Sequence, residues 1–199
     1  MKKLFLAGLM LATTQILSAQ SLGGIFQRLS FGVKVGGNYS NFTGANFDTE
    51  GLAGFHGGLI VNFKLTENWS IQEDFLYSTQ GAKIKNNLFG TKEDLKLSYL
   101  SVPIVVKYHS GIGLYFEAGA QANMLIEDAK NTSFEDFADK VDAGAVAGLG
   151  YQFKAGPVKG LGIGARYYQG FMDVGKFNSD AIKSDFKNGV GQLSVFYIF

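Results

Sequence analysis

The sequence predicts an all-β protein, an eight-stranded antiparallel up-and-down transmembrane β-barrel. Glycine makes up 27 of 199 residues, aromatic residues make up 14%, and there is no cysteine. This composition suits membrane strands better than a disulfide-bonded secreted domain. Eight segments have roughly the 9–11 residues of a tilted membrane strand and alternate apolar with polar side chains. They cover residues 31–39, 53–63, 69–79, 99–108, 114–124, 141–153, 161–167 and 190–199.

The N-terminus has the pattern of a secretory signal peptide, which we place at residues 1–19. The positively charged Lys2 and Lys3 precede an apolar run at 4–12, and Ala19 ends a small-residue cleavage site. The apolar run is too short for a helix to cross a hydrocarbon core of about 30 Å. This disfavours the alternative, an N-terminal membrane anchor. Residues 20–30 then form a periplasmic lead-in, and 31–199 form the outer-membrane β-barrel domain.

The first two predicted strands alternate regularly. In 31–39, aromatic and branched residues face outward and Lys34 faces inward. In 53–63, the same alternation turns His56 inward. Because His56 is alone in its strand, we expect a hydrogen-bonded interior residue and not a metal ligand.

The third predicted strand contains a departure from the pattern. Alternation from Trp69, an expected member of a periplasmic aromatic girdle, places Asp74 inward and Glu73 on the lipid face. A carboxylate is costly in hydrocarbon. We therefore expect either a bulge that turns Glu73 inward or an exterior partner that covers it.

The fourth and fifth predicted strands each turn one charge inward. In 99–108, Lys107 faces inward, and so does Pro103, which lacks a ladder donor; we expect a bulge or a locally broken pair there. In 114–124, Glu117 faces inward among outward alanines and Phe116.

The sixth and seventh predicted strands are rich in glycine. Asp142 faces inward in 141–153, and Arg166 faces inward in 161–167. Inward glycines in both strands leave room for large side chains from elsewhere in the interior.

The eighth predicted strand ends the chain and resembles the signal by which outer-membrane barrels are recognised for insertion. Its outward residues are Leu193, Val195, Tyr197 and Phe199. The resemblance implies that the barrel-assembly machinery is a partner during insertion.

Connections between the strands indicate the orientation. Three are short, at 66–68, 110–113 and 154–160, and four are long and polar, at 40–51, 81–94, 127–140 and 171–188. In outer-membrane barrels, short turns lie in the periplasm and long loops outside the cell. We therefore expect both termini to be periplasmic.

The inward assignments place seven ionisable side chains in one lumen. An eight-stranded barrel is only wide enough for side chains to fill it. Buried charges must then pair with one another, so we expect a closed polar network. The alternative is a conduit or ligand pocket formed by the same groups. The residues are Lys34, His56, Asp74, Lys107, Glu117, Asp142 and Arg166.

Five stretches of the chain resemble the PorT-like outer-membrane barrels. The most specific is the Tyr-Leu-Ser-Val-Pro stretch that begins at Tyr99 and leads to Lys107 and Tyr108. The resemblance implies an outer-membrane barrel and a role in protein secretion. In the family pattern Asp74 corresponds to an inward carboxylate, whereas Ser101 stands where a glutamate is usual. The matching stretches are 32–39, 70–78, 99–108, 144–151 and 164–167.

Reactive motifs are lacking, so we expect no enzyme, no cofactor and no metal site. The adjacent pair His109 and Ser110 falls at a predicted turn, with the two side chains on opposite faces. The acidic loop 127–140 lacks the spacing of a calcium loop. A formal net charge of +1 gives no electrostatic basis for binding nucleic acid.

Two functions remain open. The barrel is a structural or interaction protein, with a protein partner at its exterior loops or periplasmic face and a role in secretion or surface assembly. Alternatively, it is a porin-like barrel that binds or transports a small solute. A soluble ligand carrier is a third option, disfavoured by the outward aromatic residues. For the interaction barrel and for the transport barrel, we expect outer-membrane lipid to surround the strands.

Overall fold

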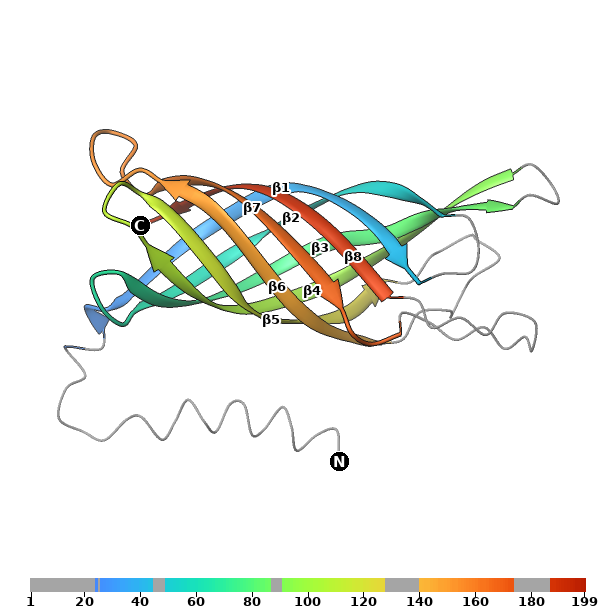
Figure 1. Ribbon diagram of the computed structural model, residues 1–199, viewed down its shortest axis with the longest axis horizontal. Coiled ribbons are helices and arrows are strands. Elements are labelled where there is room, and N and C mark those ends of the chain that lie inside the picture. Colours follow the sequence, from blue (N-terminus) through green and yellow to red (C-terminus); the bar gives the residue numbers. More distant parts are fainter. Residues whose placement is uncertain (1–23, 25, 45–48, 87–90, 128–139, 174–186) are drawn as a thin grey trace, which may run out of the picture.

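The computed structural model describes residues 24, 26–44, 49–86, 91–127, 140–173 and 187–199. Eight antiparallel strands form one closed barrel in which β8 pairs with β1 (Figure 1). The predicted fold class is therefore confirmed. The predicted signal peptide lies outside the described residues. The strands are β1 (Leu29–Thr43), β2 (Thr49–Lys64), β3 (Trp69–Asn86), β4 (Thr91–His109), β5 (Leu114–Glu127), β6 (Val141–Gln152), β7 (Leu161–Gly170) and β8 (Lys187–Ile198).

The three short connections lie at one end of the barrel, where β1 begins and the chain ends (Figure 1). Phe199 is fixed there, because its backbone N–H donates to the carbonyl of Phe31 over 2.8 Å. The β4–β5 turn closes through Gly113, whose φ of +99° is a conformation that L side chains rarely adopt. We call this the short-turn end.

At the opposite end the strands continue well beyond the predicted boundaries. Residues 81–86 of β3 pair with residues 91–96 of β4, so the expectation of a polar loop throughout 81–94 is wrong. This hairpin projects from the barrel in Figure 1. Residues 40–43 and 49–51 likewise belong to β1 and β2. Polar sequence did not end these strands, since two paired strands satisfy their backbone groups in water as well as in lipid.

Two bulges and one interruption adjust the ladders. The β2–β3 register shifts between Gly51 and His56, and the β4–β5 register shifts between Ser98 and Tyr99. At Pro103 the β3–β4 ladder is interrupted without a change in register. Of the two expectations for this proline, the broken pair is right, because the missing N–H removes one bond and adds no residue.

Glu73 does not turn inward. It pairs with Val61 on β2 and with Ile104 on β4, and the register is the same on both sides of the interruption at Pro103. Its neighbour Asp74 is fully buried in the interior, whereas Glu73 remains partly exposed on the outer wall. The expectation of a bulge is therefore wrong, and the carboxylate lies on the outward face.

The outer wall is apolar, and exposed tryptophan and tyrosine residues lie at two levels on it. Within the described ranges, no helix is long and apolar enough to cross a membrane. Near the short-turn end, Trp69 packs edge-on against Tyr108, with ring centroids 5.1 Å apart. Toward the other end lie Tyr39, Tyr77 and Tyr167, all exposed. Two aromatic girdles flanking an apolar band are typical of a membrane barrel.

Candidate functional site

All seven ionisable residues singled out in the sequence lie inside the barrel. None is more than 6% exposed. Alternation alone determines this, because each residue occupies an inward position of its strand. The structure brings five of them into one network and leaves His56 and Asp142 outside it. The five are Lys34, Asp74, Lys107, Glu117 and Arg166.

Arg166 joins the two carboxylates of the network. Its Nε donates to Oε1 of Glu117 over 2.6 Å, and its Nη1 donates to Oδ2 of Asp74 over 3.0 Å. Lys34 donates to the same oxygen of Asp74 over 2.5 Å. Charge-assisted bonds of this kind are the strong ones in a protein interior. The guanidinium therefore spans the lumen from β7 to β3 and β5.

Lys107 and Gln72 close the network into a ring. The Nζ of Lys107 lies 3.3 Å from Oε2 of Glu117 and donates to Oε1 of Gln72 over 3.0 Å. The amide nitrogen of Gln72 then donates to Oδ1 of Asp74 over 2.6 Å. The ring crosses the lumen with buried, paired groups, and it leaves no free charge to coordinate a permeating ion.

An apolar layer fills the lumen between this ring and the short-turn end. Ile60, Tyr115 and Phe196 form a buried cluster there. The ammonium of Lys107 lies 3.8 Å from the centre of the Tyr115 ring and 5.1 Å from that of Phe196. These cation–π contacts stabilise a lysine that has little access to water. The layer also separates the charged ring from the short-turn end.

Gly164 provides the space that Tyr115 occupies. A Cβ at this position would lie 2.2 Å from the Tyr115 hydroxyl. We expect Gly164→Ala to lower the free energy of unfolding by about 1–3 kcal/mol, because the ring has no free space to move into. Urea unfolding in lipid vesicles measures this. Adding Tyr115→Phe removes the clashing oxygen and should restore most of the loss; no restoration would contradict this explanation.

His56 belongs to a neutral chain of hydrogen bonds further along the lumen. Its Nδ1 lies 2.7 Å from Oδ1 of Asn38, and its Nε2 lies 2.9 Å from the Ser194 hydroxyl. An amide oxygen only accepts, so Nδ1 carries the proton and Nε2 accepts from Ser194. These are the distances of a nucleophile, a base and an orienting group. However, alternation turns the Ser194 side chain inward, toward His56, which is buried. The sequence alone does not predict this chain of hydrogen bonds, because it depends on the β1–β8 register.

One carboxylate oxygen of Asp142 accepts from neutral donors in the half of the lumen away from the short-turn end. Its Oδ2 accepts from the Tyr168 hydroxyl over 2.9 Å and from the amides of Asn123 and Asn188 over 3.3 and 3.2 Å. Within the described part of the chain it forms no ion pair. Hydrogen bonds have replaced the counter-charge that the sequence analysis expected.

His109 pairs with a different serine from its sequence neighbour. Its Nε2 lies 3.0 Å from the hydroxyl of Ser70 on β3, and Ser70 is buried. Among the described residues, no group of three or more His, Cys, Asp or Glu side chains is placed to hold a metal ion. Most of the acidic loop 127–140 lies outside the described residues.

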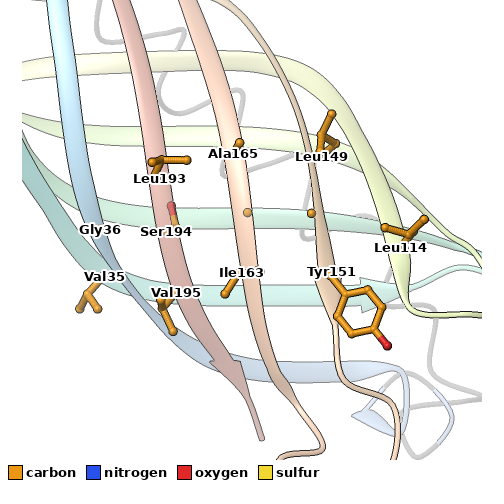
Figure 2. A pocket seen from close by; sticks show the side chains of 12 residues that line it. Val35, Gly36, Leu114, Leu149, Tyr151, Ile163, Ala165, Leu193, Ser194 and Val195 are labelled. Atoms are coloured by element: carbon orange, nitrogen blue, oxygen red, sulfur yellow. The ribbon is translucent and has the colours of Figure 1, made fainter.

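A shallow apolar groove of about 620 Å³ crosses the outer wall over β1 and β5–β8 (Figure 2). Val35, Leu149 and Ile163 line it, together with Gly150 and Gly164. The groove offers van der Waals contact alone, since its lining is almost entirely aliphatic.

The residues of the expected insertion signal share the same outer wall. Leu193 and Val195 border the groove. Tyr197 and Phe199 follow at the short-turn end, with ring centroids 5.4 Å apart. Phe199 is 74% exposed, so its side chain contributes little to the packing of the folded barrel.

Comparisons with known proteins agree with this architecture. Residues 18–175 match the family model described as "Outer membrane protein beta-barrel domain". A search of curated proteins finds no match. Among solved structures, the chain resembles neisserial surface protein A at 14% identity and a TM-score of 0.55, covering 85% of this chain and 97% of that one. It also resembles OprG from Pseudomonas aeruginosa at 12% identity and a TM-score of 0.51, covering 85% and 95%.

Proposed function

The chain belongs to the outer membrane protein beta-barrel domain family, and on this premise we propose that it is a structural or interaction protein with a closed lumen. The family places it in the outer membrane. We propose that both termini are periplasmic, and that a protein partner binds at the exterior loops or at the periplasmic face. The resemblance to PorT-like barrels supports a role in protein secretion or surface assembly.

The charged ring is the observation that supports this proposal over transport. A conduit needs groups that are hydrated or exchange their partners as a solute passes. Here Asp74 and Glu117 are held by Arg166 and by two lysines, and all five groups are buried. Opening the lumen would break several charge-assisted bonds at once. The direction of the side chains supports the proposal that the barrel is not an enzyme, because Ser194 faces inward and bonds to the buried His56.

Photocrosslinking in cells tests the proposal. A photoreactive amino acid is placed at Lys140 at the loop end, at Ile112 in a short turn, and at Ala120 on the outer wall as a control. We expect a discrete protein adduct at position 140 or 112 and lipid adducts alone at position 120. Channel recording in planar bilayers completes the test. Steady conductance that changes in a folded Glu117→Gln barrel, without protein adducts at 140 or 112, would favour transport instead.

A further inference from the structure

Glu73 lies midway between the two aromatic girdles on the outer wall. Trp69 and Tyr77 mark the two levels on β3, and Glu73 is four residues from each. Its neighbours on the same face, Ile71 and Phe75, are 38% and 41% exposed. The segment from Trp69 to Tyr77 is about 26 Å long at roughly 3.3 Å per residue. The carboxylate is therefore near the middle of the apolar band, where a charge on the lipid face is most costly.

None of the residues that the structure describes is a partner for this carboxylate. Within the described residues, Glu73 forms no hydrogen bond and no ion pair. The regular register keeps it on the outer wall, as described above. Asp74 points the other way and is already bonded to interior groups.

Basic residues on the same wall are too far away along the strands. Lys64 lies opposite Ser70 at the end of β2 and pairs with Glu67 over 3.3 Å. Lys96 lies opposite Gly81, beyond the level of Tyr77, with its ammonium over the Phe55 ring. Neither reaches the level of Glu73, so no basic side chain in the described strands satisfies the carboxylate.

We propose that the outer face of β2–β4 around Glu73 is a dimer interface, and that its occupant is a second copy of this chain. Two copies inserted in the same direction are related by a two-fold axis along the membrane normal. Each residue then meets residues at its own depth, and Glu73 can meet Glu73 of the other copy. One carboxyl group that keeps its proton donates to the other, so both are satisfied without a cation.

The surroundings of Glu73 suit such an interface. Leu59, Ile71, Phe75 and Ile104 provide an exposed apolar surface around the single polar group. Polar side chains that hydrogen-bond between membrane segments strengthen packing that apolar contacts alone leave weak. The groove on the opposite wall has the apolar surface without such a group. This inference is independent of the proposed function, because it concerns the membrane face and not the loops or the turns.

Single-cysteine crosslinking tests the dimer directly, because the natural chain has no cysteine. Ile71→Cys and Phe75→Cys probe the Glu73 face, and Leu149→Cys, at a site 54% exposed in the groove, is the control. The purified full barrel is reconstituted in phospholipid vesicles at a high lipid-to-protein ratio and treated with a short membrane-permeable bis-maleimide. We expect covalent dimers at position 71 or 75 and not at 149.

Two substitutions at Glu73 separate a specific contact from random collision. We expect Glu73→Leu to reduce the amount of crosslinked dimer about tenfold, because it removes the hydrogen bond between the two copies. Glu73→Gln should retain the dimer, since an amide both donates and accepts. Heat-modifiable migration on gels verifies that each variant is folded. Equal crosslinking at 71, 75 and 149, a dimer unchanged by Glu73→Leu, or a wild-type barrel that stays monomeric would overturn the proposal.

Discussion

Asp74→Asn is expected to lower the free energy of unfolding by about 3–5 kcal/mol, the usual cost of breaking a buried ionic network by removing one partner. Asp74 is fully buried and accepts from Lys34, Gln72 and Arg166. An amide of the same shape removes the negative charge, which leaves Glu117 as the one carboxylate of the ring facing three cations. Urea unfolding in lipid vesicles, followed by the fluorescence of the single tryptophan Trp69, measures the change.

Two variants make this result interpretable. Glu67→Gln applies the same chemical change to a carboxylate that is 91% exposed in a short connection, and we expect no measurable loss there. Arg166→Met should cost less than Asp74→Asn, about 2 kcal/mol, because Lys34 still holds Asp74 and Lys107 still holds Glu117. Equal losses in the Asp74 and Glu67 variants, or a larger loss for Arg166→Met, would contradict the network described above.

Sequence alternation predicted which residues face inward, because successive side chains of a strand point to opposite faces wherever no bulge inserts a residue. Lys34, Asp74 and Arg166 are inside for that reason alone. The partners of each charge depend on something else, the relative register of strands far apart in the chain. Gln72 completes the ring only because β3 and β4 place it beside Lys107. No pattern within one strand contains that information.

The strand ends and bulges were the parts that sequence reasoning did not predict. The polar residues in 81–94 predict a loop, yet β3 and β4 continue there as a paired hairpin beyond the apolar band. The shift near Gly51 inserts a residue on the β2 side of the β2–β3 ladder. At this bulge, the Thr79 hydroxyl on β3 accepts from the backbone N–H of Phe55 on β2 and donates to its carbonyl. A bulge of this kind depends on two strands at once.

Phe199→Ala is expected to reduce the folded barrel in the outer membrane to less than half of the wild-type amount while hardly changing the stability of molecules that do assemble. The Phe199 side chain is 74% exposed and its backbone bond to Phe31 does not depend on the side chain. Loss of an exposed side chain costs at most about 1 kcal/mol in a folded protein. A large effect in cells would therefore arise before folding is complete, when the terminal strand is recognised.

Phe116→Ala is the matched control for this prediction. Phe116 is also an outward phenylalanine near the short-turn end, 56% exposed, but it lies in β5 in the middle of the chain. If Phe199 acted only through lipid contact, both variants would assemble to the same extent, because they remove the same side chain from the same wall. Heat-modifiable migration of membrane fractions measures assembly, and urea unfolding in vesicles measures stability. We expect Phe199→Ala to assemble less than Phe116→Ala, and the two folded variants to have the same stability. Equal assembly would show that the C-terminal strand carries no insertion signal, whereas a matching loss of stability in Phe199→Ala alone would place its role in the folded barrel.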